Sequence, residues 1–248
     1  MVFRKWNDLP DILQNDKVKK YYDVLDEKRF DLFIKRIFDF TVAVFLLIIL
    51  SPLFIIISIA IKLDSKGPVM FRQIRVTQYC NQFKIWKFRT MVNNADIIGT
   101  QVTTKNDVRV TNVGRLLRKS RLDEIPQLIN IILGDMSFVG TRPEVVKYVE
   151  MYTDEMKATL LLPAGVTSKA SILYKNEESL MANVNNADDI YINEVLPQKM
   201  KYNLRSILSF SIFSEIKTMI ETVISVIKKD GSSDLVVKVE SSRNSKPI

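Results

Sequence analysis

Two adjacent carboxylates stand close to arginines in the stretch SRLDEIP, residues 120–126. Asp123 and Glu124 follow Arg118, and Arg142 comes later, in GDMSFVGTRPE. Neighbouring side chains on a helix point about 100° apart, so these two carboxylates cannot share a proton face to face. They suit separate tasks. One can bind a hard cation such as Mg²⁺ together with substrate phosphates, and the other can act as a nucleophile or a base.

The nearby arginines suit phosphate oxygens. Arg118 and Arg142 can each bind phosphate bidentately, and together with a metal ion they would stabilise the charge that develops in phosphoryl transfer. The chain contains no histidine, so the commonest general base and metal ligand is absent and catalysis must use other groups. It also contains no GxGxxG or Walker-type loop, so a nucleotide would not be held by a glycine-rich turn.

A purely structural interpretation fits the same stretch. Ser120 and Asp123 have the spacing of a capping box, Pro126 suits the first turn of a helix over PQLINIIL, and Gly134 suits its end. Acidic residues at the start of a helix complement its dipole. Spacing alone therefore leaves both the catalytic and the structural interpretation of the pair open.

Two runs upstream, VMFRQIRV and FKIWKFRTM, alternate apolar and basic residues on either side of TQYCNQ. This pattern predicts a small two-stranded ribbon with a cationic face. Its basic side chains Arg72, Lys87 and Arg89 are further candidates for binding substrate phosphate. An ordinary exposed hairpin would show the same pattern, and the aromatic residues of the ribbon could equally seat it against lipid headgroups.

Residues 40–61 form 22 consecutive positions without a charge, which is long enough to cross a bilayer as one helix. Ser51-Pro52 interrupts this segment, where proline removes a backbone hydrogen bond and bends the helix, and Ser51 can satisfy the freed carbonyl. Both flanks are basic, and positive residues prefer the cytoplasmic side. These features favour a re-entrant helix-break-helix hairpin. A spanning helix is the alternative that hydropathy alone leaves open.

The predicted fold is mainly α with a small β-hairpin, in a monotopic membrane protein. Near the C-terminus, apolar residues recur at helical spacing with lysines beside them, which indicates either a core helix or an amphipathic helix in the membrane interface. The predicted segments are a polar helical lead-in at 1–34, a re-entrant membrane helix at 35–64, a cytoplasmic catalytic domain at 65–204, an amphipathic interfacial helix at 205–230 and a flexible tail at 231–248.

Four stretches together strongly resemble a known family: GPVMFRQIRV, FKIWKFRTM, GRLLRKSRLDEIPQLINIILGDMSFVGTRPE and LPAGVTSKASI. They resemble the bacterial sugar transferases, which are monotopic polyprenyl-phosphate phosphoglycosyl transferases. The resemblance implies transfer of a sugar-1-phosphate from a UDP-sugar to undecaprenyl phosphate, with release of UMP, at the start of glycoconjugate biosynthesis. It implies that Asp123 is the nucleophile, forming a phosphosugar-aspartyl intermediate. It also implies that Glu124 helps Asp123 to place Mg²⁺, and that Arg118 and Arg142 hold phosphate groups.

The same resemblance implies a location and partners. The break at Ser51-Pro52 matches the family's re-entrant helix, which enters from the cytoplasmic face of the bacterial inner membrane. The chain length matches the family's small catalytic unit, with no bundle of membrane helices before it. The expected partners are a UDP-sugar, polyprenyl phosphate, membrane lipid and downstream glycosyltransferases. Nucleic acid is not expected, because carboxylates beside the arginines would repel its phosphates unless a metal intervened.

The chain departs from the family pattern at three places. Arg121 stands where many members have Ser or Thr, Thr141 stands where many have Pro, and the glycine of the loop at 163–168 is shifted, which leaves the role of that loop open. Sugar specificity is expected within residues 165–205. Two competing hypotheses are a non-enzymatic membrane-anchored binding protein, which the net charge of +8 would suit, and an inactive scaffold, which the intact Asp-Glu pair disfavours.

Overall fold

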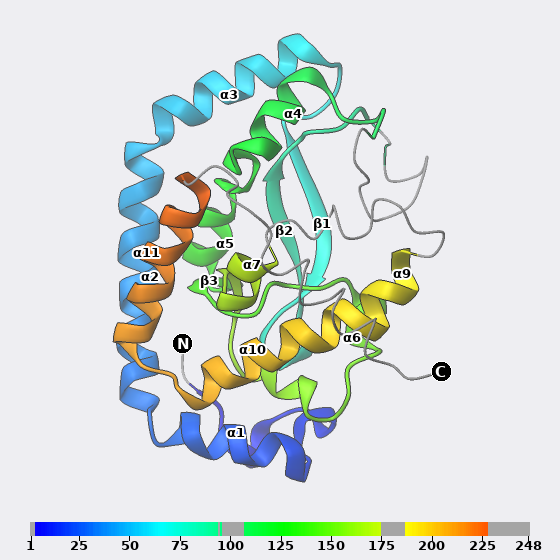
Figure 1. Cartoon of the computed structure of the whole chain (residues 1–248). Helices are drawn as coiled ribbons and strands as arrows, with labels where there is room; N and C mark the ends of the chain where they lie inside the picture. The colour runs from blue at the N-terminus through cyan, green and yellow to red at the C-terminus, as the bar shows by residue number, and fades with distance from the viewer. Residues whose placement is uncertain (1–2, 94, 96–106, 175–186, 228–248) are drawn as a thin grey trace.

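The computed structural model describes residues 3–93, 95, 107–174 and 187–227. Its helices, short helical turns (η) and strands are η1 Trp6–Asp8, η2 Asp11–Leu13, α1 Asp16–Asp26, α2 Arg29–Ile49, α3 Ser51–Asp64, β1 Met70–Val76, η3 Gln78–Cys80, β2 Gln82–Phe88, α4 Asn112–Lys119, η4 Leu122–Glu124, α5 Gln127–Leu133, β3 Met136–Val139, α6 Val146–Val149, η5 Met156–Leu161, β4 Ala164–Thr167, α7 Lys169–Leu173, α9 Ala187–Ile190, η6 Tyr191–Val195, α10 Leu196–Leu208 and α11 Ile212–Ile227. The fold is mainly helical with two small sheets, so the predicted fold class is confirmed (Figure 1).

Helices α2 and α3 form one bent pair that runs along an edge of the molecule (Figure 1). Within the described residues no single helix is long and apolar enough to cross a membrane, whereas this pair meets both criteria together and bends by 61°. Pro52 has no N–H to donate to the carbonyl of Ile48. Ser51 Oγ donates to that carbonyl instead, at 2.8 Å. The break therefore lies at the predicted Ser51-Pro52, and the bent pair is consistent with a re-entrant hairpin.

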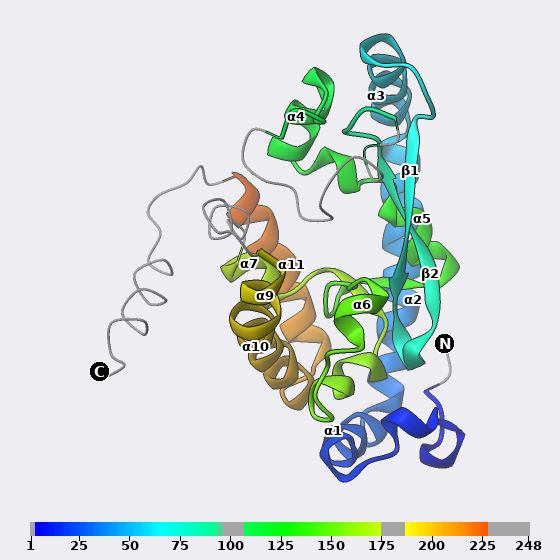
Figure 2. The same cartoon turned by 90° about the vertical axis from the view of Figure 1, so that its right-hand side faces the viewer.

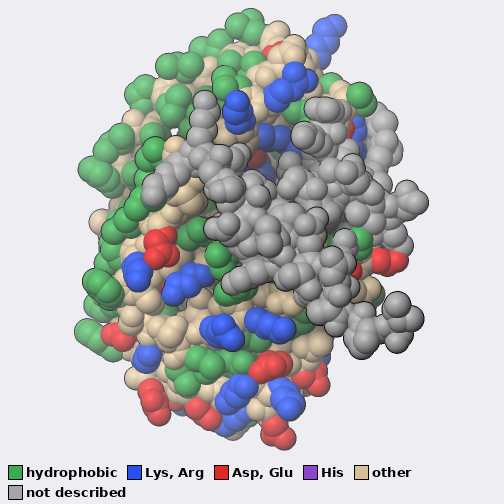
Figure 3. All heavy atoms as spheres, viewed as in Figure 1, with side chains coloured by type: hydrophobic (Ala, Val, Ile, Leu, Met, Phe, Trp, Pro, Cys, Tyr) green, Lys and Arg blue, Asp and Glu red, His purple; other side chains and the backbone are tan. Residues whose placement is uncertain are grey.

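The outer surface of this bent pair is apolar. Hydrophobic side chains follow the left and upper edges of the molecule in Figure 3, over α2 and α3. Exposed apolar residues of the two helices include Phe30, Phe33, Ile37, Phe40, Phe45, Ile48, Ile49, Ile55, Ile56, Ile59 and Leu63. A contiguous apolar surface of this kind marks an interface with lipid or with another protein.

Helix α11 overlaps α2 in Figure 1 but stands apart from most of it in Figure 2; the two are joined near the start of α11, where Lys35 Nζ donates to Glu215. Only Thr218 of this helix is buried, and its exposed apolar side chains are Phe213, Ile216, Ile220, Val223, Ile224, Val226 and Ile227. This exposure is unlike that of a core helix and is consistent with an amphipathic helix at an interface. The predicted single helix at 205–230 is divided. Helix α10 ends at Leu208, and the Ser211 and Ser214 side chains each accept the other's backbone N–H at the start of α11. The predicted tail at 231–248 lies outside the described residues.

Strands β1 and β2 pair antiparallel, as predicted, with Arg72 opposite Trp86 and Phe71 opposite Lys87. The prediction that this ribbon has one cationic face is wrong. Opposed residues share a face and successive residues alternate, so Arg72 lies with Trp86 on one face while Lys87 lies with the buried Ile85 on the other. Lys87 thus faces the interior of the protein, whereas Arg72 is exposed on the outer face.

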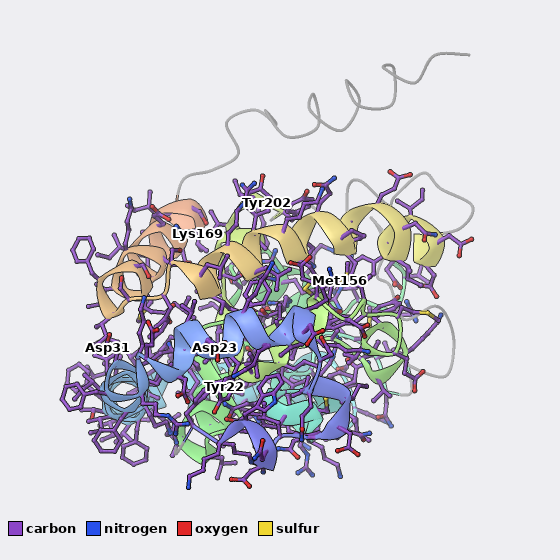
Figure 4. All side chains as sticks on the ribbon, turned by 90° about the horizontal axis from the view of Figure 1, so that it is seen from below. Tyr22, Asp23, Asp31, Met156, Lys169 and Tyr202 are labelled. Atoms are coloured by element: carbon purple, nitrogen blue, oxygen red, sulfur yellow. The ribbon has the colours of Figure 1, made fainter. Side chains whose placement is uncertain are left out.

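The N-terminal segment is more than a polar lead-in. Its side chains Phe3, Leu9, Leu13, Val18, Tyr21, Tyr22 and Leu25 belong to the largest buried cluster of the protein's described part. Helix α1 packs against η5 and α10, and Figure 4 shows α1 and α10 running side by side across the underside of the molecule, with Tyr22 and Asp23 labelled on α1. The predicted range 1–34 also contains the first residues of α2, which begins at Arg29.

A second sheet, parallel, was not predicted. Strand β3 pairs with β4, which occupies the stretch expected to be a loop around Pro163 and Gly165. Only glycine fits there, because a Cβ on Gly165 would lie 2.2 Å from the backbone N of Gly140. The shifted glycine of this chain is therefore explained by a close backbone contact, which holds the segment just before Arg142 in place.

Candidate active site

The Asp-Glu pair lies in a tight connection between α4 and α5. Ser120 Oγ donates to the carbonyls of Leu116 and Leu117 and so closes α4, which means that the expected capping box with Asp123 is wrong. Arg121 then adopts a left-handed φ of 57°, and the chain turns into η4 before α5 begins. Gly134, with a φ of 94°, ends α5 as predicted.

Asp123 is a buried carboxylate with an unsatisfied oxygen. Its side chain is buried, and its Oδ1 has no hydrogen-bond partner within the described part of the chain. Burial and the adjacent charge of Glu124 raise the pKa of Asp123, while the charges of Lys87, Arg118 and Arg121 oppose that rise. A buried charged atom without a partner is costly, and such groups concentrate at functional sites.

Glu124 is fixed by two cations. Lys87 Nζ donates to its Oε1 at 3.0 Å, and Arg142 donates to Oε1 through Nη2 and to Oε2 through Nη1 at 3.4 Å. Burial alone would raise the pKa of Glu124, but the charges and hydrogen bonds of Arg142 and Lys87 hold that pKa well below its ordinary value. The pKa values of the two neighbouring carboxyls therefore shift in opposite directions: that of Glu124 falls, so it stays ionised, and that of Asp123 rises, so it binds its proton more tightly. Such separation of paired groups is typical of catalytic sites.

Asn130 on α5 sets the position of Lys87. Its Oδ1 accepts from the backbone N of Trp86 at 2.9 Å and its Nδ2 donates to the carbonyl of Lys84 at 3.0 Å. These two hydrogen bonds attach the β1–β2 hairpin to α5, and Lys87 is the residue after Trp86. Arg142 is placed by the parallel sheet, since the carbonyl of Thr141 accepts from Gly165 N at 2.8 Å.

The remaining predicted phosphate ligands lie in different surroundings. Arg118 donates from Nε to Thr90 Oγ1 at 2.9 Å, and its charge acts on Asp123. Arg89 donates to the carbonyls of Ser65 and Lys66 and closes the connection between α3 and β1. Arg72 lies over the Trp86 ring, 4.6 Å from its centroid. The structure thus brings Lys87 and Arg142 onto Glu124, whereas phosphate binding by Arg72 and Arg89 stays a prediction without geometric support.

A cavity of about 490 Å³ opens beside the pair. Its lining includes Arg121, Glu124 and Arg142. It also includes apolar side chains, among them Leu46, Leu50, Ile125, Leu128, Phe138, Val166 and Val226. A second polar group in the lining is made of Arg75, Glu144, Tyr148, Tyr191 and Lys199. Cavities of this size bind small molecules.

The sequence pattern pointed neither to this second polar group nor to Gln127. The amide of Gln127 lines the cavity and is almost fully buried, and neither its Nε2 nor its Oε1 has a hydrogen-bond partner among the described residues. A buried amide that lacks partners indicates that a ligand completes it. The only sequence signal was a polar residue directly after Pro126, at the start of an apolar helix.

The donor set at the pair fits Mg²⁺. The part of the chain that the structure describes contains no group of three or more His, Cys, Asp or Glu side chains able to hold a metal. Magnesium needs fewer, because it binds through one or two carboxylates plus waters and substrate phosphates. Asp123 Oδ1 offers an oxygen with no protein partner, whereas both oxygens of Glu124 already accept from cations.

Comparison with known proteins identifies the family that this chain resembles. The model of the family described as bacterial sugar transferase matches residues 30–229. Over 193 residues, the chain is 35% identical to a UDP-glucose:undecaprenyl-phosphate glucose-1-phosphate transferase of Klebsiella pneumoniae, covering 76% of this chain and 39% of that protein. Over 203 residues, it is 33% identical to a UDP-N-acetylgalactosamine-undecaprenyl-phosphate N-acetylgalactosaminephosphotransferase of Aeromonas hydrophila, covering 81% of this chain and 45% of the other.

A shorter relative is covered more fully. The chain is 32% identical over 203 residues to a UDP-glucose:undecaprenyl-phosphate glucose-1-phosphate transferase of Caulobacter vibrioides. The matched residues cover 80% of this chain and 71% of that protein. By contrast, this chain spans less than half the length of the Klebsiella and Aeromonas proteins. The family match includes the bent helix pair, the Asp-Glu pair, the cavity and α11. The chain belongs to the bacterial sugar transferase family.

Proposed function

We propose that this protein transfers a sugar-1-phosphate from a UDP-sugar to undecaprenyl phosphate, releases UMP, and so starts the assembly of a glycoconjugate such as a capsule, an O-antigen, an exopolysaccharide or a glycoprotein. The named activities of the relatives support the reaction class. The observation that carries the proposal is the buried Asp123, whose Oδ1 lacks a partner beside a Glu124 held by two cations. A protein that only bound lipid or nucleic acid would have no need for this arrangement.

The reaction would proceed in two displacements at one phosphorus. An Asp123 oxygen attacks the phosphorus that carries the sugar, the bond from that phosphorus to the UMP oxygen breaks, and UMP leaves with the electron pair. An oxygen of undecaprenyl phosphate then attacks the same phosphorus. The bond to Asp123 breaks, the carboxylate is restored, and the product is the undecaprenyl diphosphate sugar.

The surrounding cations would stabilise this transfer. Arg142, which lines the cavity, and Lys87, which donates to Glu124, hold positive charge beside the Asp-Glu pair, where phosphate oxygens would gain charge as the bonds exchange. Arg118 and Arg121 add positive charge around Asp123. Asp123, through the oxygen that has no protein partner, would hold Mg²⁺ with Glu124 beside it, and the ion when bound would supply further positive charge to the phosphates of the donor.

We further propose that the protein sits on the cytoplasmic face of the bacterial inner membrane, with the bent helix pair re-entrant and α11 in the interface. The exposed apolar surfaces of α2, α3 and α11 support this placement. A cysteine introduced near residue 5 and another near residue 230 should then both react only with reagents on the cytoplasmic side. Labelling from opposite sides would instead establish a spanning helix.

The activity is tested by UMP release. The full chain in lipid nanodiscs is incubated with undecaprenyl phosphate, Mg²⁺ and, in turn, a panel of UDP-sugars. At least one donor should give UMP in proportion to lipid-linked sugar, and a chelator should suppress the release. Absence of UMP with every donor would contradict the proposed reaction, provided that the protein is folded and inserted in the nanodisc.

A further inference from the structure

Three buried side-chain amides in the described part of the chain differ in how they are satisfied. Asn130, Asn203 and Gln127 are each at most 5% exposed. A terminal amide offers two donors and an acceptor, and leaving these unpaired away from water costs free energy. Most buried amides therefore have partners in the protein or in ordered water. What satisfies each of the three amides indicates its role.

Asn130 is satisfied by the protein itself. Its Oδ1 accepts from the backbone N of Trp86 at 2.9 Å, and its Nδ2 donates to the carbonyl of Lys84 at 3.0 Å and to Asp135 Oδ2 at 3.2 Å. Both polar atoms of this amide are used, and two of the three bonds attach the hairpin to α5. The amide of Asn130 therefore has a structural role.

Asn203 on α10 is satisfied on one side only. Its Nδ2 donates to Met200 Sδ at 3.8 Å, whereas its Oδ1 has no partner among the described residues. Asn203 lines a cavity of about 40 Å³. A space of this size holds ordered water and is far too small for a substrate. Water is therefore enough to explain the unpaired oxygen of Asn203.

Gln127 differs from both. It lies on α5, three residues before Asn130, and is only 1% exposed. Neither its Nε2 nor its Oε1 has a partner in the part of the chain that the structure describes. It lines the cavity of about 490 Å³, which has room for a small molecule. Because no hydrogen bond holds this amide, a rotamer change that turns it toward a ligand breaks none.

The chemistry of the Gln127 amide limits what can satisfy it. A phosphate oxygen only accepts hydrogen bonds, so it could pair with Nε2 and would leave Oε1 unpaired. A neutral group that both donates and accepts, such as a hydroxyl, an amide or an imide, could pair with both atoms. A sugar nucleotide carries such groups on its base, its ribose and its sugar. Its diphosphate lacks them.

We propose that Gln127 contacts the UDP-sugar donor directly, through a neutral group of that donor which both donates and accepts a hydrogen bond. This inference rests on the proposed function and adds a substrate contact to it. The unliganded protein bears the cost of an unpaired amide, and the donor removes that cost when it binds. Removing the amide should therefore stabilise the unliganded protein and weaken donor binding, whereas removing a structural amide should lower stability.

The test replaces Gln127 by methionine, an apolar side chain of similar length. The ligands are analogues of UDP-glucose, UDP-galactose and their N-acetylamino counterparts, in which a methylene group replaces the oxygen between the phosphates, so that UMP cannot leave. Calorimetric titration of the full chain in detergent with Mg²⁺ measures their affinity. Gln127→Met should bind the tightest of them about tenfold or more weakly than the wild type does. Its unliganded thermal midpoint should rise by about 2–4 °C.

Gln78→Met is the matched control. Gln78 is also buried, but its Nε2 donates to the carbonyl of Leu161 at 2.7 Å and it does not line the cavity. This variant should melt at a lower temperature than the wild type and bind the analogue with unchanged affinity. If Gln127→Met behaves in the same way, this inference alone is overturned. If no analogue binds to the wild-type chain, the proposed function is contradicted together with it.

Two shorter ligands identify the group that Gln127 contacts. Loss of affinity for UDP as well as for the sugar nucleotide analogue assigns the contact to the nucleoside, and loss for the analogue alone assigns it to the sugar. Both outcomes support the proposal. Inorganic pyrophosphate has no neutral group of the required kind. An equal loss for pyrophosphate would mean that Gln127 binds only phosphate, which would overturn the proposal.

The unmutated chain decides the matter if Gln127→Met loses both affinity and stability. Its structure is determined with the analogue that binds most tightly. Gln127 Nε2 or Oε1 should then lie within about 3.2 Å of a nitrogen or oxygen of the base, the ribose or the sugar. An amide that makes no such contact in the bound state would overturn the proposal. Because the analogue cannot be turned over, this readout is independent of whether the proposed transfer reaction occurs.

Discussion

Two of the buried clusters of charged side chains in the described part of this protein differ in whether they contain a fully buried carboxylate oxygen without a hydrogen-bond partner. The proposed catalytic cluster consists of Asp123, Glu124, Lys87 and Arg142. The anchor cluster, which joins α2 to α11, consists of Lys35, Asp39, Ser137 and Glu215. In the anchor cluster, Asp39 Oδ2 accepts from Ser137 Oγ at 2.7 Å and lies 3.5 Å from Lys35 Nζ, which also donates to Glu215.

The proposed catalytic cluster has similar kinds of residues, but one of its carboxylate oxygens is left without a partner. Two cations hold Glu124, and Asp123 Oδ1 is left without a hydrogen bond in the described part of the chain. Similar burial and charge can therefore hold two helices together or keep a carboxylate available for a ligand. The presence of an unsatisfied oxygen distinguishes the two, more than the number of charges does.

The comparison predicts its largest effect for one substitution made in both clusters. Asp123→Asn should lower turnover by about a thousandfold or more, because it removes the attacking oxygen. Asp39→Asn removes a buried charge of the same kind, and the folded protein should retain its turnover. Both are measured as UMP release per folded molecule. Comparable losses in the two variants would show that burial of charge, and not a nucleophile at Asp123, supports activity.

Replacing one cation in each cluster should distinguish the two clusters again, because one variant should lose mainly activity and the other mainly stability. Arg142→Gln should reduce kcat by about a hundredfold, the usual effect of losing one donor to developing charge. Lys87 still pairs with Glu124 in this variant, so its thermal midpoint should fall less than that of Lys35→Gln. Lys35→Gln leaves Asp39 and Glu215 without their cation and should lower the free energy of unfolding by about 3–5 kcal/mol. Thermal unfolding in detergent measures the second effect. A Lys35 variant as stable as the wild type would remove the anchoring role.

The pH dependence of turnover should reflect the raised pKa of Asp123. The nucleophile reacts as a carboxylate, so kcat/KM should rise with pH through a value above that of an ordinary aspartate. Glu124→Gln removes a negative charge that raises this pKa, so the acidic limb of the profile should move to lower pH even though the maximal rate falls. An acidic limb that stays in place, or moves to higher pH, would contradict the coupling of the two carboxyls.

The smallest expected effect is on thermal stability. Asp123→Asn should raise the thermal midpoint, whereas Asp39→Asn should lower it. A carboxyl whose pKa is raised by folding contributes stability that is full below its unfolded pKa and is lost as pH rises through the folded value. At neutral pH, Asp123→Asn should therefore raise the thermal midpoint by about 2–4 °C, as about 1 kcal/mol does in a chain of this size. The gain should disappear on acidification.

Asp39→Asn should have the opposite effect on stability. Asp39 loses part of its attraction to Lys35 and its charge-assisted hydrogen bond from Ser137, and such bonds contribute about 1.5–3 kcal/mol. Its thermal midpoint should fall at neutral pH. Melting curves of the two variants over a pH series, recorded in one detergent, make the comparison direct. If both variants are destabilised, Asp123 is held by partners as Asp39 is.

Local features were predictable from sequence because their causes are local. Proline at residue 52 breaks a helix wherever it occurs in the middle of one, and alternation over residues 70–88 indicates a hairpin. Glycine at 134 ends α5 for an equally local reason. The Asp-Glu pair was found because its charges are adjacent in the chain and because the surrounding stretch resembles a known family.

Features that depend on distant segments were not predictable. The parallel pairing of β3 with β4 joins two four-residue strands that are too short to show alternation. The cavity lining joins Arg75 of β1, Glu144 from the connection between β3 and α6, Tyr191 of η6 and Lys199 of α10, and each alone resembles a surface residue. The outward position of Arg72 follows from strand register, which composition does not reveal.

The most direct test of the central claim is the covalent intermediate on Asp123. The wild-type chain is mixed with its UDP-sugar donor in the absence of lipid acceptor, quenched, digested and examined by mass spectrometry. The peptide that contains Asp123 should gain the mass of the sugar phosphate with release of one equivalent of UMP, and Asp123→Asn should show neither. Retention of the added mass in Asp123→Asn, or release of UMP only when undecaprenyl phosphate is present, would contradict the account.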